Sequence, residues 1–270
     1  YRPPFGKGII PMDAANFHKL NCDKVLENTL NKSKLKMEDV DIVAYVAGAG
    51  MSPCLLVGAN FATELSERYN KPLIPVCHQV AHLEIGKLTT QAKDPIFLYL
   101  SGGNTQIIAF TEGRYRIFGE TEDIPIGNAL DTLAREIGLE PPYGPNFDKT
   151  AEKGGKYIEL PYVVKGMDLS FTGILTAALN KFKSGVSKED ICYSMQETCY
   201  AMVTEVTERA LAHTAKNEVL LIGGVASSKR MQEMIEIMCK ERNAKMFVVP
   251  QEFAVDNGAN AAWTGVLAYK

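Results

Sequence analysis

Short apolar runs, separated by segments with helical patterning, are the feature that most constrains the fold of this chain. Three of them cover residues 41–47, 72–77 and 96–100. Each has the length of a buried strand, and helix-length segments follow the first two. Buried strands that alternate with helices pair into a partly parallel sheet covered by those helices. The sequence therefore predicts an α/β protein.

The expected division of the chain follows from a turn signal at Asp94-Pro95. We expect a first lobe over residues 1–95, with a last helix at 257–270 packing back on it, and a second lobe over 96–256. The first helix is expected from Asp13, a favoured N-cap residue, to about Leu30. Its apolar side is expected to carry Phe17, Leu20, Val25 and Leu26.

Composition excludes several classes of protein. The chain has 270 residues, 46% hydrophobic and 23% charged, which is ordinary for a globular protein. Its net charge of -3 argues against nucleic-acid binding through bulk charge. Six cysteines without a CxxC pair indicate reduced thiols in an intracellular, cytoplasmic protein. No apolar run approaches the roughly 20 residues that a membrane span needs.

A histidine pair suggests a metal site. His78 and His82 lie four residues apart, so on a helix both face the same side. The spacing also occurs between unrelated helix histidines. A third ligand is needed, and Asp256 is the candidate, although it can equally be the N-cap of the last helix. Gln79 stands where a zinc protease of the HExxH type has its glutamate, which argues against that activity.

Glycine turns and two aspartates suggest a ligand pocket. Residues 101–104 (SGGN) join two predicted strands, either as a plain hairpin turn or as a nest of N–H groups around phosphate. Gly223-Gly224 ends a third strand before a helix, where a ligand can approach the backbone. Asp131 and Asp148 can face ribose hydroxyls or cap helices. No dinucleotide-binding or P-loop fingerprint occurs.

Seven motifs occur together over nearly the whole chain. In order they are HxxxH, YLSGGNTQ, GNALD, PPYGP, VVKGMDLSFTG, GGVAS and DNGAN. In this combination the chain resembles the universal tRNA threonylcarbamoyltransferase family, in the branch that forms the catalytic subunit of the archaeal and eukaryotic KEOPS complex. The resemblance implies the two-lobed fold of actin, sugar kinases and heat-shock ATPases, with a nucleotide cleft between the lobes.

The resemblance also implies a reaction and its site. The reaction is acyl transfer from threonylcarbamoyl-AMP to N6 of the adenosine next to the anticodon of ANN-decoding tRNAs, with release of AMP. One divalent metal ion per subunit, iron or zinc, would bind His78, His82 and Asp256, with Tyr99 near it. The nucleotidyl pocket would be lined by Tyr99, Leu100, Ser101, Gly102, Gly103, Asp131, Gly144, Asp148, Gly223, Gly224 and Ser228.

Partners are implied as well. They are tRNA, a small dimerising subunit that docks on the N-terminal helical region, a kinase-like subunit and a further small regulatory protein. Three departures from the family pattern stand out. The strand and phosphate-loop motif that precede a segment like residues 1–4 are expected to be absent. Residues 48–50 read GAG in place of GPG, and Ser228 stands where asparagine is common.

Two other functions remain open from the sequence. A kinase or ATPase of the same fold would need an aspartate base and would have no use for paired histidines. A scaffold subunit that binds nucleotide without catalysis is the second alternative. Bound metal and threonylcarbamoyl transfer distinguish both from the transferase.

Overall fold

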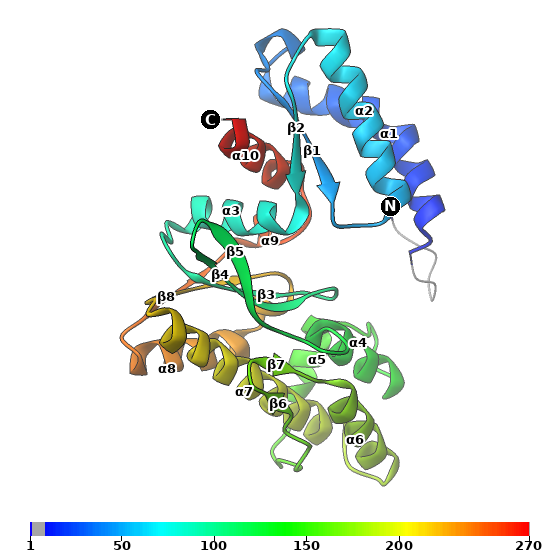
Figure 1. Cartoon of the computed structure of the whole chain (residues 1–270). Helices are drawn as coiled ribbons and strands as arrows, with labels where there is room; N and C mark the ends of the chain where they lie inside the picture. Colours follow the sequence, from blue (N-terminus) through cyan, green and yellow to red (C-terminus); the bar gives the residue numbers. More distant parts are fainter. Residues whose placement is uncertain (2–8, 270) are drawn as a thin grey trace. The chain divides into compact units, whose positions relative to one another are not determined.

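The computed structural model describes residue 1 and residues 9–269, which divide into two compact units (Figure 1). The first unit contains Tyr1–Ile85 and Asp256–Lys270, and the second contains Gly86–Val255. The division falls inside helix α3 (His78–Thr90), whereas the turn signal placed the lobe boundary at residue 95. The segment at residues 1–4 was compared with the family pattern above. Its residues 2–4 lie outside the described residues.

In the first unit, two parallel strands are joined by a helix. Strand β1 (Val43–Gly48) pairs in parallel with β2 (Leu73–Cys77), and α2 (Ser52–Tyr69) connects them. Helix α10 (Gly258–Tyr269) packs against both strands, so the end of the chain returns to its first part as expected. Figure 1 shows α1 (Pro11–Ser33) alongside α2. This unit carries the parallel pairing that the alternation of runs predicted.

Helix α1 differs from its prediction at two points. It begins at Pro11 with Ile10 as N-cap, so Asp13 lies in the first turn and the predicted cap was wrong. The predicted apolar side of the helix is largely exposed. Phe17, Leu20 and Val25 are 43%, 84% and 60% exposed, and the buried positions of the helix are Ala14 and Ala15. Periodicity located an apolar stripe that the described residues leave largely exposed, with the ring of Tyr1 against that of Phe17.

The second unit is built on a five-stranded mixed sheet in the order β5-β4-β3-β8-β9. The strands are β3 (Ile96–Leu100), β4 (Thr105–Thr111), β5 (Arg114–Glu120), β8 (Glu218–Ile222) and β9 (Lys245–Val248). Strand β3 pairs antiparallel with β4 and in parallel with β8, because β3, β4 and β5 form successive hairpins and long helical segments precede β8. The central strand β3 is buried along its whole length. The predicted strand at 96–100 is confirmed, as is a second strand directly after the turn at 101–104.

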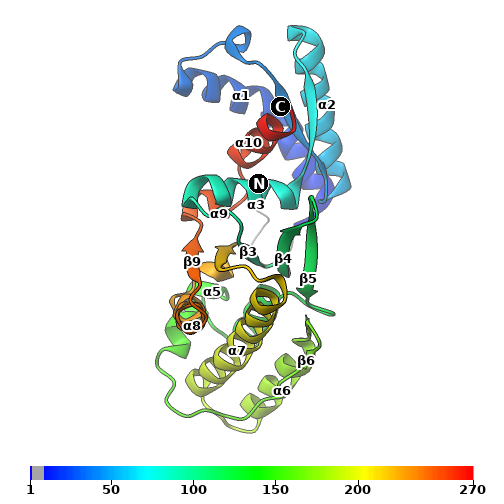
Figure 2. The same cartoon turned by 60° about the vertical axis from the view of Figure 1, so that its left-hand side comes forward.

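Helices on one side of this sheet complete the second core (Figure 2). They are α4 (Ile126–Glu136), α5 (Gly144–Ala151), α6 (Thr172–Lys183), α7 (Lys188–Thr214) and α8 (Lys229–Glu241). Helix α7 is central, since it contacts α4, α5, α6 and α8 as well as three strands of the sheet, β3, β4 and β5. The short elements η1 (Met37–Asp39), β6 (Val164–Lys165), β7 (Asp168–Leu169), η2 (Val225–Ser227) and α9 (Gln251–Ala254) were not predicted.

Two further expectations concern the whole described chain. All six cysteines are free thiols, which agrees with the absence of a paired-cysteine pattern. Among the described residues, no helix has both the length and the apolar character of a membrane span.

Candidate functional site

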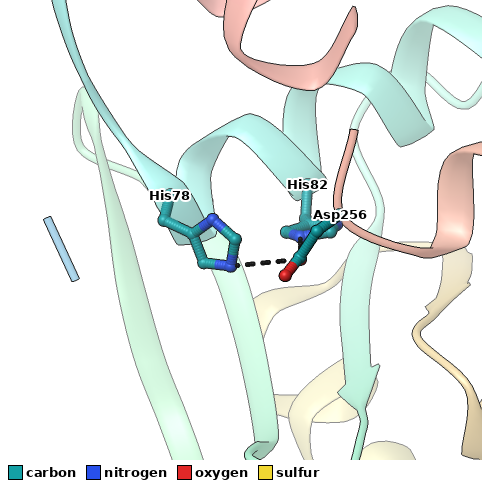
Figure 3. A group of neighbouring side chains, drawn as sticks. All are labelled: His78, His82 and Asp256. Atoms are coloured by element: carbon teal, nitrogen blue, oxygen red, sulfur yellow. Dashed lines mark hydrogen bonds and ion pairs between the residues drawn. The ribbon is translucent and has the colours of Figure 1, made fainter. Parts of the chain in front are cut away.

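Two histidines and an aspartate converge in the first unit (Figure 3). His78 opens α3 and His82 follows one turn later, while Asp256 lies between α9 and α10. Oδ1 of Asp256 is 3.0 Å from Nε2 of His82 and 3.5 Å from Nε2 of His78. One ligand atom from each of the three residues lies within 4.8 Å of the others. We call these three residues the HHD cluster.

The surroundings of the HHD cluster place its groups in the states that a metal requires. Burial and the neighbouring His82 lower the pKa of His78, against the attraction of Asp256. The hydrogen bond with His82 holds the pKa of Asp256 below its ordinary value. At neutral pH His78 is therefore neutral and Asp256 is ionised. The side chain of His82 is only 2% exposed, and Asn260 of α10 lies 3.3 Å from its Nδ1.

The donor set of the HHD cluster suits a transition metal. Two imidazole nitrogens and one carboxylate oxygen on one side of a point leave further coordination positions for water or substrate. The amide of Asn260 holds the far nitrogen of His82, an arrangement that fixes the ring orientation of ligating histidines. The alternative role of Asp256 as a helix cap is filled by Asn257, whose Oδ1 accepts a hydrogen bond from the Asn260 N–H.

A pocket of about 290 Å³ lies in the second unit. Six of the predicted substrate residues line it: Gly102, Asp131, Gly144, Asp148, Gly224 and Ser228. The other residues in its lining are Gly127, Leu130, Tyr143, Pro145, Tyr200, Val225, Ser227 and Gln251. The pocket therefore gathers the ends of strands and helices that carry the GNALD, PPYGP and GGVAS motifs.

The remaining predicted residues surround the pocket without lining it. Tyr99 and Leu100 are 3% and 0% exposed in β3, and a role near the HHD cluster for Tyr99, which lies in the other unit, stays a prediction. Ser101 uses its hydroxyl inside the turn, where it accepts from the N–H groups of Gly103 and Asn104. Gly223 borders a smaller cavity of about 180 Å³ behind η2.

Two glycines hold the SGGN turn in place by close contact. A Cβ at Gly127 would lie 2.7 Å from the carbonyl oxygen of Ser101. Gly223 has a φ of +97°, and a Cβ there would collide with the carbonyl of Leu100. Only glycine fits at both points. The turn that carries Gly102 into the pocket is thus fixed from two sides.

Polar groups cluster around Asp148 at the base of the pocket. Nε2 of Gln196 donates to Oδ1 of Asp148 at 2.7 Å. Tyr200 is 1% exposed, and Ser228 Oγ is buried and has no partner within hydrogen-bond geometry, although both adjoin Asp148. Burial raises the pKa of Asp148, and the neighbouring Ser228 hydroxyl and the hydrogen bond from Gln196 oppose this rise. Burial likewise raises the pKa of Asp131, and the N–H of Gly144 opposes it.

Comparison with known proteins decides the family. The family model described as tRNA N6-adenosine threonylcarbamoyltransferase matches residues 1–263. The chain belongs to this family. A protein of that name from Thermofilum pendens is 52% identical over 270 residues, which is all of this chain and 80% of that protein. Its counterpart from Archaeoglobus fulgidus is 53% identical and is covered to 83%.

A longer relative carries an additional part. The probable bifunctional tRNA threonylcarbamoyladenosine biosynthesis protein of Methanosphaera stadtmanae is 52% identical over 97% of this chain, which spans 49% of that protein. As a member of the threonylcarbamoyltransferase family, the chain is a transferase that modifies N6 of an adenosine in tRNA. The predicted recognition and function are confirmed at this level.

Solved structures show the fold. HypF from T. kodakarensis superimposes with a TM-score of 0.68 at 15% identity over 87% of this chain, which spans 41% of that protein. The activator of the 2-hydroxyisocaproyl-CoA dehydratase from Clostridium difficile, solved with bound ADPNP, gives a TM-score of 0.55 at 13% identity. It is covered to 81%, and this chain to 91%. The predicted α/β fold class is confirmed.

Two residues near Asp148 escaped sequence reasoning. Gln196 and Tyr200 lie four apart on α7 and turn one face of that helix toward Asp148. The available signal was a glutamine inside a long helix with many buried positions, where a buried polar group needs a partner. The partner itself is on α5, and no local pattern links the two helices.

Proposed function

We propose that this transferase takes threonylcarbamoyl-AMP as donor and modifies the adenosine next to the anticodon of ANN-decoding tRNAs. The N6 amine attacks the carbamoyl carbon, a C–N bond forms, and the bond from that carbon to the phosphate oxygen breaks. AMP leaves with the electron pair, and N6 loses one proton. The match of the family over residues 1–263 carries this proposal.

The HHD cluster is proposed to hold one divalent ion, iron or zinc. His78 and His82 would bind through Nε2 and Asp256 through its carboxylate, which is supported by the distances among these atoms. A bound ion supplies Lewis-acid stabilisation of negative charge that develops on the donor during transfer. The role of this chain is to keep the His78 ring neutral and the Asp256 carboxylate ionised, as the lowered pKa of each favours.

The pocket in the second unit is proposed to bind the AMP part of the donor. Asp131 and Asp148 would accept hydrogen bonds from the ribose and the base, and their partial burial strengthens such bonds. Backbone N–H groups of residues 101–103 and 223–224 would face the phosphate. Ser228, with a buried hydroxyl that lacks a partner, has a vacant hydrogen bond to offer there.

No side chain in either site is assigned as a general base for the amine. AMP is a good leaving group, so correct placement of donor and adenosine accounts for much of the expected rate. The proposal also includes the KEOPS partners, namely the small dimerising, kinase-like and regulatory subunits, and a cytoplasmic location. The names of the bifunctional relatives support a tRNA substrate but leave these partners as proposals.

Reconstitution tests the proposed reaction. The purified chain with its partners, tRNA, threonine, bicarbonate, ATP and the adenylate-forming enzyme should yield threonylcarbamoyladenosine. His78→Ala should lose both bound metal and product, whereas His213→Ala, which removes an imidazole from the end of α7, should lose neither. Full transfer by the metal-free His78→Ala enzyme would reject the metal's role. Phosphorylated product without transfer would instead support a kinase.

A further inference from the structure

Gln196 is buried behind Asp148, out of reach of the pocket itself. Its side chain belongs to α7, is 4% exposed and does not line the cavity, whereas Asp148 does. Its one recorded hydrogen bond to a carboxylate runs from Nε2 to Oδ1 of Asp148 over 2.7 Å. Gln196 can therefore influence a ligand only through its neighbours, which are Asp148 and the pocket residue Tyr200.

The chemistry of the pair fixes the direction of this hydrogen bond. An ionised carboxylate only accepts, so the amide must present its NH₂ group to Asp148. Burying a polar amide between core residues such as Met195 and Cys199 is unfavourable unless the amide is well bonded. A leucine would suit the packing better. The glutamine is thus explained by its bond to Asp148 rather than by the core.

The hydrogen bond from Gln196 also gives the two oxygens of the Asp148 carboxylate different roles. With Oδ1 engaged by Gln196, the second oxygen of Asp148 is left for a ligand, and the carboxylate cannot rotate freely. Ser228 Oγ, buried and unpartnered, stands on the same side of the pocket. An acceptor oxygen beside a hydroxyl is a suitable receptor for a hydrogen-bond donor of a nucleoside.

We propose that Gln196 is a positioning residue, which orients Asp148 so that its second oxygen accepts a hydrogen bond from the nucleoside of the bound donor. This inference rests on the proposed nucleotide pocket. The donating group is a ribose hydroxyl or the 6-amino group of the base. Binding of 2′-deoxy-AMP, 3′-deoxy-AMP and purine riboside monophosphate, each lacking one candidate group, identifies which one it is.

A double-mutant cycle tests the proposal, with AMP as the probe and calorimetry as the readout. Gln196→Leu should weaken AMP binding about tenfold or more, the range for one hydrogen bond to a charged group. In an Asp148→Ala background the same change should have no further effect, because Gln196 acts through Asp148. In steady-state assays Gln196→Leu should raise KM for the donor and leave kcat largely unchanged.

An isosteric variant adds a pH test that a purely structural role would not pass. In Gln196→Glu two carboxyl groups face each other, and they tolerate contact only while they share a proton. AMP binding by this variant, relative to wild type, should therefore worsen as pH rises. The ratio of the two dissociation constants cancels the titration of the phosphate of AMP. If the leucine variant fails to fold, this variant still decides the question.

The outcomes separate this inference from the proposed pocket. Thr207→Val on the same helix, whose hydroxyl bonds only to the carbonyl of Val203, is the control and should bind AMP as wild type does. Equal losses from Gln196→Leu with and without Asp148 would overturn the positioning role, as would unchanged AMP binding. If Asp148→Ala itself leaves AMP binding intact, the nucleotide pocket fails first.

Discussion

His82 Nε2 and Asp256 Oδ1 lie 3.0 Å apart, although 174 residues separate them along the chain. The packing of α10 on the strands of the first unit brings them together, since Asp256 directly precedes that helix and His82 follows β2. A contact of this kind between an imidazole and a carboxylate serves either a metal or a plain ion pair. The first prediction distinguishes the two.

Asp256→Ala should remove a metal ligand while leaving the fold in place. The Asp256 side chain is 82% exposed, so its ion pair contributes little to stability. We expect a drop of at least about a hundredfold in affinity for zinc or ferrous iron, with a change in melting temperature of no more than a few degrees. Competition with a chelator and elemental analysis measure the first, and calorimetry the second. Unchanged metal affinity would reduce Asp256 to a surface ion pair.

Asn260 should affect the same metal without touching it. Its side-chain amide contacts Nδ1 of His82, so it orients the ring whose Nε2 faces Asp256. Removing such a partner lowers metal affinity by about tenfold to a hundredfold, and Asn260→Ala is expected to fall in this range. Asn260→Asp, which places a carboxylate acceptor beside a protonated Nδ1, should bind metal at least as well as wild type. Equal affinities for all three proteins would contradict the role.

Asp123 should stabilise the second unit in a pH-dependent way. Burial raises its pKa, but the Phe171 N–H, the Ser170 hydroxyl and the Thr172 N–H together bring it well below the ordinary value. The carboxylate thus caps α6, whose own N-cap residue, Phe171, makes no side-chain cap. At neutral pH Asp123→Ala should lower the free energy of unfolding by roughly 1–2 kcal/mol.

The sign of the pH effect follows from the lowered pKa of Asp123. A folded pKa below the unfolded one gives stability that is present above about pH 4 and is lost as pH falls below it. The difference between wild type and Asp123→Ala should therefore shrink between about pH 5 and pH 2. Urea titrations at several pH values measure it. A difference that stays constant down to pH 2 would show that the carboxylate charge is not what caps α6.

The exposed stripe of α1 should be a docking face for the small dimerising subunit. Leu20, at 84% exposure, stands with Phe17 and Val25 on a surface that the described part of the chain leaves uncovered. Leu20→Glu should abolish co-elution with that subunit in gel filtration but leave metal content and melting temperature unchanged. Ile237→Glu, an equally severe change at a 54% exposed site on α8, serves as control. Continued co-elution of the Leu20→Glu protein would place the interface elsewhere.

Much of this architecture was predictable because it depends on local patterns. The run at 96–100 is apolar at every position, so its assignment as a buried central strand needed no tertiary information. The histidine spacing placed His78 and His82 on one face of a helix, which the structure has as α3. Several residues of the pocket were predicted from the sequence motifs rather than from the spacing of apolar residues.

The failures share a cause, since each depends on a distant partner. Asp123 caps a helix through residues up to 49 positions later, and Gln196 is explained by Asp148, 48 positions earlier. Neither contact can be recognised from the residues that neighbour it in the sequence. The burial of the apolar side of α1 could not be predicted either, because an exposed apolar stripe and a core-facing one have the same period. Only burial in the folded chain tells them apart.

The contacts of Gly127 and Gly223 with the turn at residues 101–102 change what the motifs can be taken to diagnose. SGGN, GNALD and GGVAS are locked to one another by backbone against backbone, before any substrate arrives. A homologue that lost the transferase reaction but kept this fold would still need all three motifs, because their backbone contacts hold the fold together. Among distant homologues, the presence of these three motifs therefore indicates common ancestry more directly than it indicates activity. Retained catalysis is better judged from site residues that are not needed for these backbone contacts.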